Sequence, residues 1–182
     1  LAAVGEARDG LRSMGVPIGA TLVGFHAGAR WPTRRWPVER FVALAKHLLE
    51  SRPGAVALFT AGPGEEEAAR ACVAQLAPPR AFVVSGWPIA RFVALQSLCA
   101  AFVSGDTGPL HTSVASGART LGLMSRNRPA MFFPYPEREG HRAHYARVEC
   151  SPCHRDECDD LRCLTRLTVA GAWELLRGMV AG

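Results

Sequence analysis

Short runs of apolar residues recur along the chain, and each run is bounded by glycine, proline or polar residues. Runs of this length, rich in valine, leucine and phenylalanine, are typical of the buried strands of a parallel sheet. They predict strands at residues 21–25, 55–59, 81–84, 101–104 and 120–124.

Segments with a helical spacing of apolar residues separate or follow these runs. The clearest begins at Pro37, a residue suited to the first turn of a helix, and leads into an apolar stripe that ends at Leu49. We predict helices at residues 37–49, 65–76, 88–99, 109–117 and 168–180. Alternating strands and helices predict an α/β fold, a Rossmann-like parallel sheet with helices on both faces. In such sheets ligands bind in the loops at the carboxyl ends of the strands.

The length of the chain, 182 residues, suits one domain with its own hydrophobic core. We expect a single domain over residues 1–182, with an α/β core at about 20–125, an irregular cysteine-rich segment at 126–165 and a C-terminal helix at 168–180. No apolar run approaches the ~20 residues of a membrane span, and the first ten residues lack the pattern of a secretory signal. These features predict a cytoplasmic protein.

Arginine dominates the positive charge, since Lys46 is the only lysine in a chain of net charge +5. Arginine binds phosphate in a bidentate way, so a nucleotide diphosphate, a phosphorylated glycan or an anionic membrane surface would suit this charge. A GC-rich genome also enriches arginine, which explains much of the composition. Because no dense basic run is interleaved with aromatic residues, we expect no nucleic-acid partner.

The loop after the first predicted strand combines small residues with three arginines. Gly28 and Ala29 would let a ligand approach the backbone, and Arg30, Arg34 and Arg35 follow just before the next helix. Arginines beside a helix N-terminus would hold a pyrophosphate. An arginine-rich, solvated loop with two packing tryptophans is the alternative interpretation.

Two further loops carry acids at the start of a helix. Glu65, after Gly62 and Pro63, could accept hydrogen bonds from ribose hydroxyls, or could simply stabilise the first helical turn. Asp106 suits sugar hydroxyls, and Thr107 with the following N–H groups could donate to phosphate. In the alternative interpretation, this second acid is an ordinary helix cap.

The six cysteines fall into two sets. Cys72 and Cys99 lie among apolar helical neighbours and are expected in the core. The cluster of Cys150, Cys153, Cys158 and Cys163 could bind a structural zinc ion, stay reduced, or form two disulfides in an oxidising compartment. Its spacing lacks the paired knuckles of a zinc site, so we expect no metal.

Three of these loops, in their order and spacing, resemble glycosyltransferase family 9, the heptosyltransferases of lipopolysaccharide core assembly. The matching segments are Gly-Ala-x-Trp-Pro-Thr-Arg-Arg-Trp-Pro at 28–37, Gly-Pro-x-Glu at 62–65 and Ser-Gly-Asp-Thr-Gly-Pro-Leu-His at 104–111. The likeness extends over residues 23–169, and some members also have a C-terminal cysteine-rich stretch. The combination is specific, whereas no single segment is.

The resemblance implies a bacterial enzyme with the two-lobed GT-B fold, of which this chain resembles the C-terminal, donor-binding lobe. That lobe binds a nucleotide-sugar, typically ADP-heptose, and the reaction inverts the anomeric carbon without a required cofactor or metal. The partners would be a lipopolysaccharide core or other glycan acceptor, the N-terminal lobe with its base, and the inner face of the bacterial inner membrane. We expect the isolated lobe to be inactive.

The resemblance also implies roles for single residues. Gly28, Ala29 and Arg34 should face the diphosphate, where Arg34 stabilises the leaving group. Glu65 should meet the ribose and Asp106 should position the donor sugar. Thr107, Gly108 and His111 complete the expected donor site.

Two departures from the family pattern bear on the donor. The family usually has lysine where Arg34 stands, which keeps the charge but changes its geometry. Residues 125–129, Ser-Arg-Asn-Arg-Pro, replace a usual Gly-Pro-Thr turn in a loop that is expected to line the donor pocket. A non-catalytic domain that binds a nucleotide or glycan, and a GT-B-type epimerase of UDP-sugars, are the alternative functions.

Overall fold

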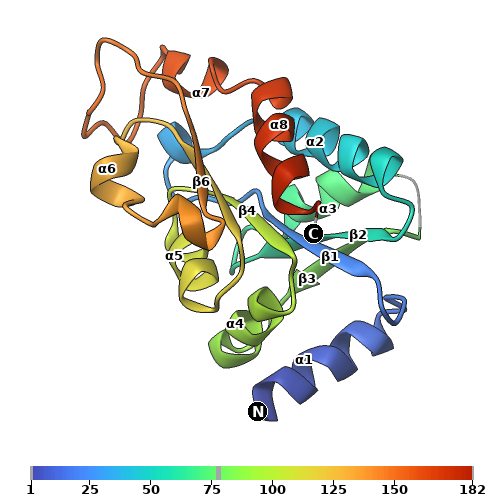
Figure 1. The fold of residues 1–182 in the computed structure, drawn as a ribbon. Helices are drawn as coiled ribbons and strands as arrows, with labels where there is room; N and C mark the ends of the chain where they lie inside the picture. The colour runs from blue at the N-terminus through green and yellow to red at the C-terminus, as the bar shows by residue number, and fades with distance from the viewer. Residues whose placement is uncertain (1, 77–78, 182) are drawn as a thin grey trace.

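The computed structural model describes residues 2–76 and 79–181 and contains a parallel sheet with the strand order β3-β2-β1-β4-β5-β6 (Figure 1). The predicted α/β, Rossmann-like fold is therefore confirmed. Residues 1, 77–78 and 182 of the expected single domain lie outside the described residues. The strands are β1 (Thr21–His26), β2 (Ala55–Ala61), β3 (Ala81–Ser85), β4 (Ala101–Gly105), β5 (Thr120–Met124) and β6 (Arg142–Tyr145).

The five strands predicted from apolar runs are all present, with ends within two residues of the expected positions. The central strands β2, β4 and β5 are buried along nearly their whole length, which explains why their sequences show continuous apolar runs instead of alternation. The chain builds β1, β2 and β3 outward in one direction, then returns to place β4, β5 and β6 on the other side of β1. The strand order thus reverses between β1 and β4, and a crevice opens at such a point.

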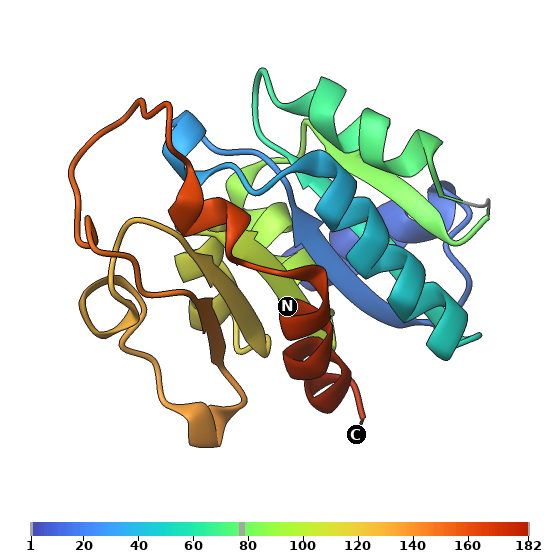
Figure 2. The same cartoon turned by 90° about the horizontal axis from the view of Figure 1, so that it is seen from above.

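Helices cover both faces of the sheet. One face carries α2 (Val38–Ser51), α3 (Glu66–Ala74) and α8 (Val169–Met179), and Figure 2 shows α2 and α8 side by side. The opposite face carries α1 (Ala2–Ser13) and α4 (Ile89–Ser97), which lie together below the sheet in Figure 1. Alternate residues of β2 enter the two cores, since Phe59 belongs to the first and Leu58 to the second.

Helix α2 follows the predicted apolar stripe and also holds the C-terminal part of the chain. Its buried residues are Phe41, Val42, Leu44, Ala45, Leu48 and Leu49. The Arg40 guanidinium donates hydrogen bonds to the carbonyls of Leu164, Thr165 and Leu167, at 3.2, 2.9 and 2.7 Å. The adjacent Trp36 indole donates to the Leu167 carbonyl at 2.9 Å. These bonds fix α8 and the turn before it against α2.

The segment at 126–165 is not irregular throughout, which corrects the expectation. It contains β6 at the sheet edge, the short helices α6 (Pro129–Phe132) and α7 (Arg162–Thr165), and the 3-10 helix η2 (Glu137–Glu139). Strand β6 pairs with β5, and its residues Ala143 and Tyr145 pack against a small apolar cluster. The sequence of β6, Arg-Ala-His-Tyr, has no apolar run, and all four residues are half-buried. The pattern of apolar positions therefore could not reveal it.

Of two further helices, one was predicted and the other was not. Helix α5 (Gly108–Ala115) confirms the short helix expected after β4. The N-terminal helix α1 was not predicted, although its apolar residues recur at helical spacing and Ala7 and Leu11 are buried. Among residues 2–76 and 79–181, no helix has both the length and the apolar character needed to cross a bilayer.

The stripe on α2 generates a stability prediction. Leu48→Ala should lower the free energy of unfolding by about 2–5 kcal/mol, because Leu48 is fully buried and its removal leaves a cavity. Lys46→Ala, on the exposed side of the same helix, should change it by less than about 0.5 kcal/mol. Urea titration followed by circular dichroism measures both, and equal effects would show that the stripe does not face the core.

Candidate functional site

A cavity of about 840 Å³ lies at the carboxyl ends of the strands. The loops after β1, β2, β3 and β4 form its walls, so it occupies the point where the strand order reverses. Ligand pockets are commonly of this size and position in open α/β sheets. The loops expected to carry chemistry therefore do surround a common space.

The loop after β1 is folded tightly over the end of β4. The Arg35 guanidinium donates to the carbonyls of Ala29 at 2.7 Å and Arg30 at 3.1 Å, so it shapes the loop and does not serve the cavity. The 3-10 helix η1 (Pro32–Arg34) comes next. A Cβ atom on Gly105 would lie 2.8 Å from the Arg34 carbonyl oxygen, so glycine is required where this loop crosses β4.

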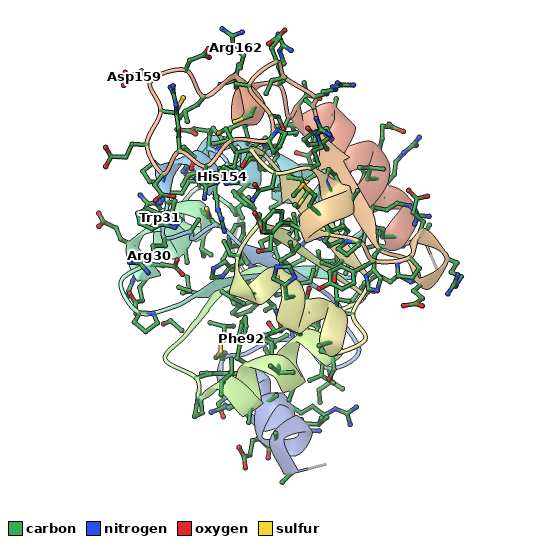
Figure 3. The ribbon with its side chains drawn as sticks, turned by 90° about the vertical axis from the view of Figure 1, so that its left-hand side faces the viewer. Arg30, Trp31, Phe92, His154, Asp159 and Arg162 are labelled. Carbon is green, nitrogen blue, oxygen red and sulfur yellow. The ribbon has the colours of Figure 1, made fainter. Side chains whose placement is uncertain are left out.

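Arg30, Trp31 and Arg34 face the cavity. Figure 3 shows Arg30 and Trp31 next to each other, and the Arg30 guanidinium lies 4.8 Å from the Trp31 ring centre. Phe92, on α4, lies below them in this view and lines the opposite, apolar wall. One wall is thus cationic and the other apolar.

Arg34 connects the loop after β1 with the loop after β4. Its Nη1 donates to the Asp106 carbonyl oxygen at 3.0 Å and lies 3.7 Å from the Asp106 carboxylate oxygen Oδ2. Its side chain is 23% exposed, so the guanidinium is anchored at one end and still reaches the cavity. Such a group can bind an anion without first losing much conformational freedom.

Asp106 is buried and held by three neighbours. The Asn127 side-chain amide donates to Oδ2 at 2.7 Å, while His111 Nε2 lies 4.0 Å from Oδ1 and Arg34 approaches from the cavity side. The helix-cap alternative does not describe this acid, because Thr107 occupies the cap position of α5. Asp106 is instead the centre of a small polar network at the edge of the cavity.

Of the other residues in the predicted turn, some line the cavity and one belongs to the polar network around Asp106. Thr107 and Gly108 line the cavity, and the Thr107 hydroxyl lies 3.1 Å from that of Ser104. A Cβ atom on Gly108 would meet nothing within 4 Å, so a ligand can approach the backbone there. His111 does not line the cavity; its Nδ1 lies 2.9 Å from the Tyr135 hydroxyl, in the segment after β5.

Glu65 lines the cavity opposite Arg34, at the start of α3. One carboxylate oxygen, Oε2, accepts a hydrogen bond from the Gly62 N–H at 3.0 Å and lies 3.3 Å from His26 Nε2. The hydrogen bond with His26 is the main reason why the pKa of Glu65 lies below its usual value. The group is therefore a carboxylate, which can accept hydrogen bonds from hydroxyls.

The structure gives Gly28 a different place from the one expected. Ala29 lines the cavity, whereas Gly28 lies behind Glu65. A Cβ atom on Gly28 would lie 2.2 Å from the Glu65 carboxyl carbon, so the glycine makes room for that carboxylate. The small size of Gly28 therefore leaves space for the Glu65 carboxylate and does not bring a ligand close to the backbone.

The loop after β5 does not line the cavity, which corrects the expectation for residues 125–129. It is buried and braces the site from behind. The Ser125 hydroxyl donates to the Thr33 carbonyl at 2.8 Å, and Asn127 holds Asp106. Arg126 donates to the carbonyl of Arg155 and forms an ion pair with Asp156 at 3.0 Å.

The cysteines divide as expected. Burial raises the pKa of Cys72 and of Cys99 to about 12, consistent with core positions. In the segment at 150–163, Cys150 is exposed and Cys163 is buried, and burial raises the pKa of the Cys163 thiol. Across residues 2–76 and 79–181 the thiols are unpaired, and no three metal-binding side chains are grouped to hold an ion.

The specific roles of three parts of the site were not predicted from the sequence. His26 stands at the start of the arginine loop but carries no motif of its own, and Asn127 reaches Asp106 from a distant segment. The apolar wall comes from the end of β3, the loop after it and α4, and includes Val84, Trp87 and Phe92. Its aromatic residues gave the only available signal, because they lie at the carboxyl end of a predicted strand.

The assembled site can bind a ligand of mixed character. Arg30 and Arg34 supply positive charge, and the backbone at the start of α5 is accessible beside them. Glu65 and Asp106 supply acceptors for hydroxyl groups, and the wall with Phe92 can contact a planar or apolar group. These properties suit a phosphorylated compound that carries sugar hydroxyls and a ring.

Solved structures show the same fold. The Escherichia coli ADP-heptose lipopolysaccharide heptosyltransferase II is 21% identical, with a TM-score of 0.79 over 97% of this chain and 51% of that one. A glycosyltransferase family 9 protein from Veillonella parvula is 21% identical, with a TM-score of 0.82 over 100% and 52%. The E. coli heptosyltransferase WaaC with ADP is 19% identical, with a TM-score of 0.70 over 95% and 48%.

The chain therefore spans about half the length of these proteins. A comparison with curated proteins finds no match. The model of glycosyltransferase family 9 (heptosyltransferase) matches residues 6–163, which is most of the chain and includes every loop that borders the cavity. The chain belongs to glycosyltransferase family 9.

Proposed function

We propose that this chain is the donor-binding lobe of an inverting heptosyltransferase that transfers heptose from ADP-heptose to a lipopolysaccharide core acceptor. The observation that carries the proposal is the convergence of Arg34, Glu65 and Asp106 on one cavity, in a chain of this family. Among the similar structures, one is described as an ADP-heptose heptosyltransferase and another contains ADP.

The donor's parts have matching groups in the cavity. The diphosphate would lie between Arg34 and the backbone of Ala29, Thr107 and Gly108, where α5 begins. The ribose would meet Glu65, and Gly28 would contribute by seating that carboxylate. The apolar wall with Phe92 would contact the base.

Asp106 would position the transferred sugar by accepting hydrogen bonds from its hydroxyls. His111, which lies between Asp106 and Tyr135, would keep that network in place and not contact the diphosphate directly. Because Asn127 and Arg34 both approach Oδ2, the other oxygen of Asp106 faces fewer competing donors. A preorganised acceptor of this kind orients the anomeric carbon for attack.

In the transfer step, a base takes the proton of an acceptor hydroxyl, and that oxygen forms a bond to the anomeric carbon. The bond from the anomeric carbon to the diphosphate oxygen breaks on the opposite side, and the electron pair leaves with ADP. Arg34 and the N–H groups at the start of α5 would stabilise the negative charge that develops there. With those groups in place, the proposed mechanism requires no metal ion or other cofactor.

The remaining partners lie outside this chain. The base and the acceptor site belong to an N-terminal lobe in the proposal, consistent with a chain that spans half of its structural relatives. The isolated lobe would then bind donor without transferring sugar. A lipid-linked acceptor would place the enzyme at the inner face of the bacterial inner membrane, as a peripheral protein.

A nucleotide comparison tests the proposed donor. ADP and ADP-sugars should raise the melting temperature of the chain more than UDP, GDP or their sugar derivatives at equal concentration. Differential scanning fluorimetry measures the shifts. A preference for UDP-sugars would favour a GT-B-type epimerase. Binding of ADP with no transfer in the complete two-lobed enzyme would favour a non-catalytic nucleotide-binding domain.

The role of Arg34 is tested by removing its charge. Arg34→Ala should weaken ADP binding by roughly tenfold to a hundredfold, the scale of one lost charge-assisted hydrogen bond. Arg138→Ala removes the same charge from an 83% exposed side chain outside the cavity and should leave the affinity unchanged. Isothermal titration calorimetry compares the two variants, and equal affinities would remove Arg34 from the diphosphate site.

The role of Asp106 is tested in the complete two-lobed enzyme. Asp106→Asn should lower the transfer rate at least about a hundredfold, since a sugar hydroxyl loses its charged acceptor. The affinity for ADP should not weaken, because the change removes a negative charge beside Arg34. The rate at which ADP is formed measures transfer, and calorimetry with ADP measures the affinity. Turnover that persists at the wild-type rate would contradict the assignment.

A further inference from the structure

His26 is a buried, ionisable side chain at the floor of the cavity that the proposed transfer step does not use. It is the last residue of β1, lines the cavity and is only 4% exposed. Its register partner on β2 is Thr60, and the Thr60 hydroxyl lies 3.1 Å from His26 Nδ1. Its other ring nitrogen, Nε2, lies 3.3 Å from Glu65.

These two contacts determine which nitrogen carries a proton. A bare Nε2 would set a lone pair against the Glu65 carboxylate, which is unfavourable. Nε2 therefore carries a proton whether the ring is neutral or charged. A charged ring also donates at Nδ1 to Thr60, which leaves the single Thr60 hydroxyl proton for the Phe25 carbonyl oxygen at 3.3 Å; a neutral ring takes that proton at Nδ1 instead. In either state Nε2 donates toward Glu65, so the direction of this interaction does not depend on the charge of the imidazole.

The contacts on Glu65 all act at one carboxylate oxygen. Oε2 accepts from the Gly62 N–H and faces His26 Nε2, and the carboxyl carbon lies where only a glycine fits at position 28. Within the part of the chain that the structure describes, Oε1 is therefore the oxygen left to face a ligand. A glutamate fixed in this way can accept a hydrogen bond without losing further side-chain entropy.

We propose that His26 is a positioning residue that turns Glu65 Oε1 toward the ribose hydroxyls, so that the site selects ribonucleotides over deoxyribonucleotides. The inference rests on the proposed function, because it requires a nucleotide in the cavity. It adds to that function a preference for ribonucleotides, which depends on His26 as well as on Glu65. Thr60 and Gly28 are the fixed supports of the pair.

Two amide variants separate the contacts of the imidazole. In His26→Asn the side-chain amide can replace Nδ1 near Thr60 but cannot reach Glu65. In His26→Gln the amide nitrogen can replace Nε2 and still donate to Glu65. The two variants have the same charge and polarity, and each keeps a different one of the two contacts of His26.

The measurement is the affinity of the wild-type chain and both variants for ADP, 2′-deoxy-ADP and 3′-deoxy-ADP by calorimetry. Wild type and His26→Gln should bind ADP roughly tenfold or more tightly than at least one deoxy analogue. His26→Asn should lose that preference because its affinity for ADP falls, while its affinity for the deoxy analogues stays the same. A general disturbance of the fold would instead weaken all three nucleotides together.

The outcomes separate the inference from the function on which it rests. If wild type does not bind ADP, the proposed function fails and the inference fails with it. If wild type binds ADP but does not distinguish the deoxy analogues, or if His26→Asn keeps the distinction, only the inference is overturned. Equal weakening of all three nucleotides by His26→Asn also overturns it, and the proposed function stands.

Discussion

The pairing of β1 with β4 is the constraint on which the rest of the site depends. These strands are far apart in the sequence, and the strand order reverses between them. Because the chain leaves β1 toward one side and β4 toward the other, their two loops diverge and leave a crevice. Gly105 then lets the Arg34 backbone cross the end of β4 closely, and this contact places a cation above Asp106.

The two acids of the site have similar surroundings. Each carboxylate is held by hydrogen-bond donors on one side and borders the cavity on the other. Asp106 is held by Asn127, and Glu65 is held by Gly62 and His26. A carboxylate that borders a partly apolar cavity would otherwise lose hydration without compensation. Fixed donors replace that hydration and also reduce the freedom of the side chain, so stability and ligand orientation follow from the same contacts.

The elements and loops of the site were predictable because they follow local patterns. Apolar runs and helical stripes located β1 to β5 and the helices between them, and the loops at their carboxyl ends then had to meet. The role of Gly28 was not predictable, since it depends on a Glu65 side chain that approaches from another loop. The same holds for Asn127, which comes from a segment without a regular pattern. Strand β6 was not predicted because its four residues contain no apolar run.

The segment after β5 contacts the loop that carries Arg34 and supports it. The Thr33 hydroxyl, immediately before Arg34, donates to the carbonyls of Arg155 and Asp156 at 3.1 and 3.3 Å. Arg126 bonds to the same two residues, so they bridge the loop after β1 and the loop after β5. Residues 155–156 lie between the cysteines at 153 and 158, in a stretch with little apolar core. The cysteine-rich segment therefore contacts the loop that carries Arg34 through the Thr33 hydroxyl, so loss of that hydroxyl would remove two hydrogen bonds between them.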